Sequence, residues 1–212
     1  MTAAVTVRGV TVVRDQVRML DTVTAHVEAG EVLLLTGRNG AGKTTLLRVI
    51  AGIITPTRGA VRVGGRRPDD RDAVFRRTLA ALIGPPQTAR DLTLEEHLRF
   101  IAATWGANPT TAGARAEELL STLAIAPLAH RYPHELSSGQ SQLAAIAMTL
   151  ARPSEVLLLD EPEQRLDPDR QGLVIDALRS RAEAGTALVL ASHSPRFVEE
   201  LADRDLHLVG EV

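Results

Sequence analysis

The sequence predicts an α/β fold with a mainly parallel sheet, and three observations support this prediction. Two runs of four apolar residues, Val32–Leu35 and Val156–Leu159, contain no polar side chain, which is typical of strands buried on both faces of a parallel sheet. Stretches with the apolar spacing of helices separate the predicted strands. A length of 212 residues with 44% hydrophobic residues suits one globular α/β domain, which we expect to cover residues 1–212.

The N-terminal part of the chain alternates between predicted strands and turns. Residues 5–13 alternate in polarity and are rich in β-branched side chains, which favours a strand. A second strand is expected at Val23–Val27, because Ala29-Gly30 follows it as a turn. After a helix expected at Leu46–Ile50, we predict a turn at Pro56–Gly59 and short strands at Val61–Val63 and Leu79–Ile83.

From Thr93 onward the pattern becomes helical. Thr93 and Glu96 form a capping-box pattern that predicts the start of a helix, and Ser137 and Gln140 form another. The second of these helices is expected to run to about Ala151. The remaining predicted elements are helices at 111–124 and about 168–184 and strands at 156–159 and 187–191.

A glycine-rich segment connects the strand at Val32–Leu35 to the helix that follows it. Its residues fit G-x-x-x-x-G-K-[ST], the pattern of phosphate-binding loops, in the strand–loop–helix context that this motif requires. They are Gly37, Arg38, Asn39, Gly40, Ala41, Gly42, Lys43, Thr44 and Thr45. The glycines allow backbone N–H groups to turn toward a phosphate, and the start of the helix adds its positive end. Lys43 would reach the β- and γ-phosphates of a nucleotide, and the Thr44 hydroxyl would bind Mg²⁺.

Lys43 is also the only lysine in a chain whose other basic residues are arginines. The wide fork of an arginine would not fit a site shaped for a compact ammonium group. An ordinary glycine-rich turn before a helix is the alternative interpretation of the segment. The apolar strand and helix pattern on either side of the segment favours the phosphate loop, and the single lysine strengthens this interpretation.

Two carboxylates, Asp160 and Glu161, follow the apolar run Val156–Leu159. The carboxyl ends of parallel strands are where ligands usually bind in open α/β sheets. Asp160 suits Mg²⁺, directly or through water, and Glu161 could polarise an attacking water molecule. The alternative is a strand that simply runs into a charged turn.

Composition limits the classes of function. The net charge of −2 and the pI of about 6.3 do not indicate a nucleic-acid-binding surface, so no nucleic-acid partner is expected. The lack of cysteine excludes disulfides and thiolate metal sites, and the histidines at 26, 97, 130, 134 and 207 lack metal-ligand spacing. No apolar run approaches the ~18 residues of a membrane span, and the start of the chain lacks the features of a signal peptide. Any role at a membrane is therefore expected to come through a partner.

The order of these motifs resembles that of the nucleotide-binding domain of ABC (ATP-binding cassette) ATPases. That family has a phosphate loop, a Gln loop, an LSGGQ signature, an acidic strand, a D-loop and a switch histidine. The matching positions here are Gly37–Thr45, Gln87, Leu136–Gln140, Val156–Glu161, Leu166-Asp167 and His193. The resemblance implies a P-loop NTPase with a RecA-like core and an antiparallel β portion, at 1–86 and 152–212. It also implies a helical subdomain at 87–151 that carries the signature.

The resemblance also implies ATP hydrolysis, with ATP and Mg²⁺ as cofactors, in a head-to-tail dimer. Each ATP would lie between the phosphate loop of one chain and the signature of the other. Ser137, Gly139 and Gln140 would then contact the γ-phosphate held by the partner, with Asp167 at the seam. His193 would bond the γ-phosphate and orient both the water and Glu161. The dimer is expected to be a homodimer or a pseudo-symmetric pair of ATPase subunits.

The sequence departs from the family pattern at several positions. Gln87 fits the Gln loop and its expected contacts with Mg²⁺ and the γ-phosphate, but Asp91-Leu92-Thr93 follows sooner than usual, and a gapless count places Gly84 there instead. Ser138 stands where the signature has a glycine. The D-loop carries bulky Gln164 and Arg165 where small residues are usual.

Arg14 is another departure. It stands where similar proteins have an aromatic residue that stacks on adenine. A guanidinium plane can also stack on a base, so we expect Arg14 to contact adenine. In the alternative, Arg14 is only an exposed charge at the end of a strand, and Val13 or Val17 forms the apolar surface under the base.

The expected role is the energising subunit of a membrane transporter whose transmembrane subunits are separate chains. It would be cytoplasmic and peripheral on the inner face of the cell membrane. The chain ends 19 residues after His193, so the regulatory domain of sugar importers is not expected, and its compactness, similar to that of exporter-type subunits, favours export. The alternatives are a soluble ABC ATPase, such as an iron–sulfur-assembly ATPase, and a phosphate-loop kinase or GTPase outside the family.

Overall fold

The computed structural model describes residues 3–210, and the contacts of the chain divide it into two units. Residues 1–2 and 211–212 of the predicted domain lie outside the described residues. The first unit consists of Met1–Ile83, Ser154–Glu161 and Arg179–Val212. The second consists of Gly84–Pro153 and Pro162–Leu178, so it contains the predicted helical subdomain together with a second stretch of chain.

One sheet of the first unit is antiparallel, with strand order β2-β1-β4. The strands are β1 (Val5–Arg14), β2 (Val17–Val27) and β4 (Arg58–Val63). Strand β2 begins six residues before the predicted strand, because the chain turns at Asp15 and Gln16, which both have positive φ (47° and 65°). Turn positions of this kind favour Gly, Asn and Asp, so Asp15 suits its position, but Gln16 does not, and the pair gave no Asn-Gly or Asp-Gly hairpin signal.

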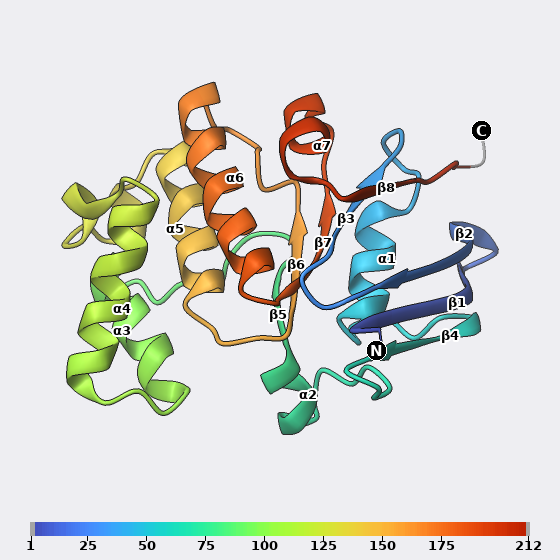
Figure 1. Cartoon of the computed structure of the whole chain (residues 1–212), viewed down its shortest axis with the longest axis horizontal. Helices are drawn as coiled ribbons and strands as arrows, with labels where there is room; N and C mark the ends of the chain where they lie inside the picture. The colour runs from blue at the N-terminus through green and yellow to red at the C-terminus, as the bar shows by residue number, and fades with distance from the viewer. Residues whose placement is uncertain (1–2, 211–212) are drawn as a thin grey trace. The chain divides into compact units, whose positions relative to one another are not determined.

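The second sheet of the first unit is parallel, with strand order β5-β6-β7-β3-β8, which confirms the predicted α/β class (Figure 1). The strands are β3 (Val32–Thr36), β5 (Leu79–Leu82), β6 (Val156–Asp160), β7 (Ala187–Ala191) and β8 (Arg204–His207). The two apolar runs lie in β3 and β6, and every residue of both runs is buried. Both strands pair with β7, so their carboxyl ends lie at the same edge of the sheet.

Helix α1 (Lys43–Ile50) packs between the two sheets of the first unit, as Figure 1 shows. Its Leu46 and Leu47 belong to one core with Val12 of β1 and Leu158 of β6. Burial on both sides explains why six of its eight residues are buried. Three elements of the structure were not predicted from the sequence: α2 (Ala73–Thr78), α7 (Pro195–Leu201) and β8.

The second unit is helical. It contains α3 (Leu94–Thr104), α4 (Pro109–Thr122), α5 (Ser138–Leu150), most of α6 (Pro168–Glu183) and 3₁₀ turns at Ala126–Leu128 and Pro133–Glu135. Helices α3 and α4 pack against each other, and both contact α5. No helix in residues 3–210 is long and apolar enough to cross a membrane.

Both predicted capping boxes are confirmed at the starts of α3 and α5. The Glu96 carboxylate accepts from the Thr93 N–H at 2.8 Å, and the Gln140 side chain accepts from the Ser137 N–H at 2.9 Å. The bond from the Thr93 N–H lowers the pKa of Glu96, with a smaller contribution from the Thr93 hydroxyl. These bonds satisfy donors that the first turn of a helix would otherwise leave without partners.

Candidate functional site

The phosphate loop joins β3 to α1 and passes directly against strand β2. Gly42, immediately before α1, has φ 95° in the left-handed region. A Cβ atom at this position would lie 2.8 Å from the carbonyl oxygen of Met19 and 2.7 Å from a methyl carbon of Leu20. Both the backbone conformation and this close approach therefore require glycine.

The Lys43 side chain folds back across the phosphate loop. It is buried, and its ammonium donates to the carbonyl oxygens of Gly37 (2.9 Å) and Arg38 (3.2 Å). Both partners are neutral, and no carboxylate within residues 3–210 forms an ion pair with Lys43. The loop thus holds an uncompensated positive charge in a fixed place, which suits an anionic ligand.

Thr44 and Asp160, both predicted metal ligands, lie in contact. The Thr44 hydroxyl donates to Asp160 Oδ2 at 2.8 Å, which joins the start of α1 to the end of β6. The other carboxylate oxygen, Asp160 Oδ1, is buried without a hydrogen-bond partner in the described part of the chain. A buried, unpaired anionic oxygen beside a hydroxyl is a set of hard oxygen donors that fits Mg²⁺.

Glu161 is held in a strained backbone conformation at the end of β6. Its φ is 50°, and its N–H donates to the carbonyl of Ala191 at 2.8 Å. A left-handed conformation at a residue other than glycine costs about 1–3 kcal/mol and tends to occur at functional sites. The side chain lies beside the segment that follows β7, where Glu161 Oε1 is 3.5 Å from Nε2 of His193.

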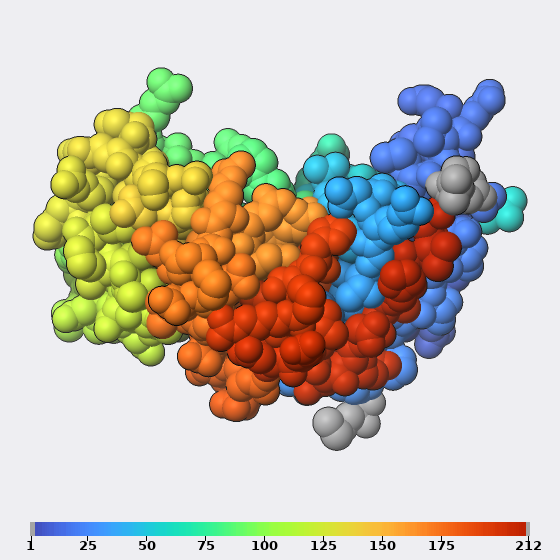
Figure 2. All heavy atoms as spheres, turned by 90° about the horizontal axis from the view of Figure 1, so that it is seen from above, coloured from blue at the N-terminus to red at the C-terminus, as the bar shows by residue number. Residues whose placement is uncertain are grey.

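A hollow of about 520 Å³ lies beside the phosphate loop in the first unit. In Figure 2 the light-blue atoms around the loop are exposed next to the red atoms of the segment that follows β7. The residues lining the hollow are Thr36, Gly37, Arg38, Ser192, His193, Pro195, Val198, Glu199 and His207. The structure therefore brings the predicted switch histidine and the phosphate loop to one open cavity.

In the second unit, the predicted signature residues open helix α5. The Ser137 side chain caps the helix by accepting from the Gln140 N–H. A Cβ atom on Gly139 would lie 2.7 Å from the carbonyl oxygen of Arg165, so the D-loop packs directly on the first turn of α5. This second reason for glycine could not be read from the sequence, because it depends on a contact between distant segments.

The other predicted residues of the second unit have simpler surroundings. Asp167 accepts from the backbone N–H of Arg170 at 2.9 Å and forms an ion pair with its side chain at 3.4 Å, so it caps the start of α6. Gln87 is exposed in the segment before α3. Arg14 ends β1 in the first unit, where it is exposed and lies opposite Val17 of β2.

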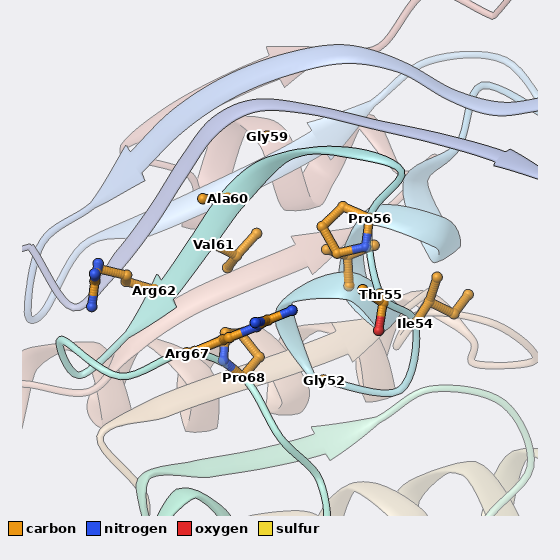
Figure 3. A pocket seen from close by; sticks show the side chains of 11 residues that line it. Gly52, Ile54, Thr55, Pro56, Gly59, Ala60, Val61, Arg62, Arg67 and Pro68 are labelled. Carbon is orange, nitrogen blue, oxygen red and sulfur yellow. The ribbon is translucent and has the colours of Figure 1, made fainter.

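A separate pocket of about 290 Å³ lies along strand β4 of the first unit. Figure 3 shows Arg67 extended toward Thr55 between β4 and the loop after α1. None of the predicted site residues lines this pocket. In residues 3–210 there is also no cluster of three or more His, Cys, Asp or Glu residues that could hold a metal.

Comparison with known proteins identifies the family. A family model described as "ABC transporter" matches residues 20–164, which is more than half of the chain. The chain belongs to the ABC transporter family. As an ABC-type ATP-binding cassette it is an ATPase, and the kinase or GTPase outside this family is excluded.

Curated relatives agree with this assignment. The cassette is 39% identical over 214 residues to a putative ABC transporter ATP-binding protein of Streptomyces avermitilis, covering 97% of this chain and 36% of that protein. It is 34% identical over 191 residues to the glutamine transport ATP-binding protein GlnQ of Escherichia coli, covering 88% of this chain and 80% of GlnQ. The chain thus spans about a third of the length of its Streptomyces relative, 36%, and most of GlnQ.

Solved structures have the same fold. An ATP-binding subunit of an ABC transporter aligns with a TM-score of 0.87 at 28% identity, covering 98% of this chain and 86% of that one. A dimeric ATP-binding cassette bound to ADP and Pi aligns with a TM-score of 0.86 at 24% identity, covering 96% and 94% of the two chains. These likenesses confirm the predicted ABC cassette fold, with an antiparallel β portion beside a parallel sheet.

Proposed function

We propose that this cassette is the ATP-hydrolysing subunit of a transporter and that it works as a head-to-tail dimer. The observation that carries the proposal is the cluster of Lys43, Thr44, Asp160, Glu161 and His193 around one phosphate loop. Each of these side chains has a chemical task in phosphoryl transfer to water. That reaction depends on positioning and electrostatics more than on covalent chemistry.

Lys43 would hold the β- and γ-phosphates by exchanging its two carbonyl partners for phosphate oxygens. The backbone N–H groups of Gly37, Asn39, Gly40, Gly42 and Thr45 would complete the phosphate cradle. Thr44 and Asp160 would hold Mg²⁺, which when bound neutralises charge on the phosphate oxygens. The unpaired Oδ1 of Asp160 supports this role, because an ion would satisfy it.

Glu161 would orient the attacking water and accept its proton as the γ-phosphate departs. His193 would bond the γ-phosphate through its ring and keep the carboxylate of Glu161 in place. The strained backbone at Glu161 supports this assignment, because the fold maintains an unfavourable conformation that a simple charged turn would not need.

In the dimer, Ser137, Gly139 and Gln140 of one chain would contact the ATP held by the other. The Ser137 oxygen already accepts from the Gln140 N–H, which leaves its own proton available for donation to a phosphate. The positive end of α5 would add to this anion site. Asp167 would lie at the seam, where its capping of α6 fixes its position.

Gln87 would contribute to the sensing of Mg²⁺ and the γ-phosphate. It is exposed and unpaired among the described residues, so its amide is available for such a contact. The rival position, Gly84, has no side chain and a φ of 82°. A glycine cannot supply a ligand oxygen from a side chain, which favours Gln87.

Arg14 would lie against adenine, and the strand register supports this placement. Val12 and Leu20 are paired and buried, and Leu20 would meet a Cβ atom added to Gly42 of the phosphate loop. Because side chains alternate along a strand, Arg14 shares the face of Val12, and its partner Val17 shares it too. Val13 points to the opposite face, so Val17 is the better alternative floor for the base.

We further propose that separate transmembrane subunits couple the cassette to a membrane on its cytoplasmic side. Relatives named for import, such as methionine import MetN 2 and osmoprotectant import OsmV of Salmonella, bear on the direction of transport. These relatives favour import, in contrast to the export expected from the compact sequence. The soluble iron–sulfur-assembly ATPase remains the alternative role.

Purification from membranes tests this role. A tagged chain with Glu161→Gln, solubilised in mild detergent with ATP, should retain integral membrane proteins encoded beside it. Reconstitution of that complex into vesicles then gives the direction of transport from the side on which ATP must be added. Recovery of the chain with soluble assembly proteins alone would contradict the transporter role.

A further inference from the structure

The segment Gly84–Leu92 carries Gln87, and most of its residues are exposed. It connects β5 to α3 without forming a helix or strand. In the described part of the chain, the segment makes a single hydrogen bond, from the N–H of Ala89 to Nε2 of His97 at 3.0 Å. Both residues belong to the second unit, so this contact lies within one compact body.

The hydrogen bonds of His97 define the state of its ring. A backbone N–H can only donate, so Nε2 must be the unprotonated acceptor. The other nitrogen, Nδ1, lies 2.8 Å from the carbonyl oxygen of Thr93, so it carries the proton and donates. Both ring nitrogens of His97 are therefore paired, and its side chain is buried.

Helix α3 positions this ring. His97 lies one turn after the cap residue Thr93, whose carbonyl accepts from both the backbone N–H and Nδ1 of His97. The side chain thus points back toward the start of the helix, which is the usual direction for long side chains in helices. The capping box between Thr93 and Glu96 fixes that start.

Packing does not replace this hydrogen bond. A cavity of about 160 Å³ lies between the segment and helix α5. Pro86 and Thr88 line it on one side, Ala144 and Met148 of α5 line it on another, and His97 forms part of the wall. A segment above a cavity has few apolar contacts to hold it, so its one polar anchor carries more weight.

We propose that His97 is a positioning residue for Gln87. It fixes the backbone at Ala89, two residues after Gln87, and so determines where the amide of Gln87 is presented. The inference rests on the proposed role of Gln87 in ATP hydrolysis. His97 itself contacts no reacting atom and acts only through the backbone of the segment.

Two substitutions separate the anchor from mere packing. His97→Leu keeps a buried apolar side chain but leaves the Ala89 N–H without an acceptor. His97→Gln keeps an acceptor oxygen that reaches about as far as Nε2. The matched control is His130→Gln, since His130 belongs to the same unit but has an exposed side chain that pairs with Glu95 instead.

Amide hydrogen exchange of the full chain without nucleotide tests the anchor directly. In His97→Leu we expect exchange in a peptide covering 84–92 to rise about five- to ten-fold, while α5 exchanges as before. His97→Gln should restore most of the protection, and His130→Gln should match the wild type. Unchanged exchange in His97→Leu, or an equal rise in α5, would overturn the inference.

ATP hydrolysis provides the second measurement. In His97→Leu we expect kcat to fall about ten-fold with KM for ATP within about two-fold, because a displaced Gln87 affects the reacting geometry and not the phosphate loop. His97→Gln should recover the rate, and failure to recover it would contradict a positioning role. A normal rate of hydrolysis in Gln87→Ala would contradict the proposed role of Gln87 in the reaction. It would not affect the conclusion that His97 anchors the segment, because the exchange experiment is done without nucleotide.

Discussion

The hydroxyl of Thr44 donates to the carboxylate of Asp160 over 2.8 Å, although 116 residues separate the two in sequence. This bond joins the phosphate loop to the acidic strand and leaves Asp160 Oδ1 buried without a partner. An enzyme that binds no cation would gain little from such an oxygen, because a buried unpaired charge is costly. The donors of this pair therefore fit a hard metal ion such as Mg²⁺.

We predict that Asp160→Asn lowers the affinity of the site for Mg²⁺ but does not lower its affinity for nucleotide in the absence of Mg²⁺. The amide keeps the size of the carboxylate but removes its charge. The Mg²⁺ concentration for half-maximal hydrolysis should rise at least about ten-fold. Titration of activity with Mg²⁺ after treatment with EDTA measures this. Activity of the wild type that persists in excess EDTA would contradict a metal-dependent reaction.

Lys43→Ala should remove most ATP affinity or turnover. The substitution deletes the one point charge on the β- and γ-phosphates, and we expect kcat/KM to fall by at least about 100-fold. Arg48→Ala is the matched control, because Arg48 is an exposed cation on the same helix. Near-normal hydrolysis by Lys43→Ala would show that the loop does not bind the phosphates of ATP.

Glu161→Gln should leave ATP binding intact and slow hydrolysis by at least about 100-fold, because the amide cannot accept a proton from water. ATP should then hold two chains together. Light scattering with and without ATP measures the mass. Ser137→Arg in the same background should prevent the dimer by filling the anion site at the start of α5.

A monomer at every ATP concentration would contradict the dimer of ATPase subunits for the isolated chain. The same measurement on a complex with membrane subunits would then show whether they are required. If the dimer stays intact when Ser137→Arg is added, the signature residues do not lie at the dimer interface.

Arg14→Ala should raise the dissociation constant for ATP about five-fold, since a stacked guanidinium contributes roughly 1 kcal/mol. GTP should be affected similarly, because such a contact distinguishes little between bases. The matched control is Arg18→Ala. Arg18 lies opposite Val13 on the other face and pairs with Asp21. If Arg14→Ala and the wild type bind ATP with equal affinity, Val17 is favoured as the residue that contacts the adenine base.

Low pH should lower the free energy of unfolding of the second unit, because Glu96 becomes protonated. The hydrogen bond from the Thr93 N–H holds the folded pKa of Glu96 below its ordinary value, so its contribution is present at neutral pH and is lost as the pH falls through the folded pKa. Urea unfolding at pH 7 and pH 3 tests this. The difference between the two midpoints should be smaller in Glu96→Gln than in the wild type or in a Glu117→Gln control. Equal differences in all three would contradict the assignment.

The sequence predicted the fold class well because the apolar runs in β3 and β6 are unbroken and the phosphate loop has a fixed pattern. It failed at the Asp15-Gln16 turn, where Gln16 adopts a positive φ that its side chain does not favour. It also missed α7, although Pro195 stands at its first turn as helix starts often do.

Site residues were predictable as residue types but not as contacts. The two carboxylates after the apolar run Val156–Leu159 indicated Asp160 and Glu161, whereas nothing in the sequence indicated the left-handed backbone of Glu161, whose N–H donates to Ala191 of β7. The spacing of His97 in the sequence excludes a metal site, but it gives no sign that the ring accepts a hydrogen bond from the Ala89 N–H. Such contacts arise only when the chain has folded.

The single lysine of this chain gives it an unusual chemistry toward labelling reagents. Apart from the N-terminus, the only primary amine is Lys43, which is buried and held by two carbonyls of its own loop. Coupling to dyes or surfaces through amines would therefore modify either the chain end or the nucleotide site. Since the chain has no cysteine, any thiol introduced on an exposed face would be unique, and immobilisation through it would leave that site untouched.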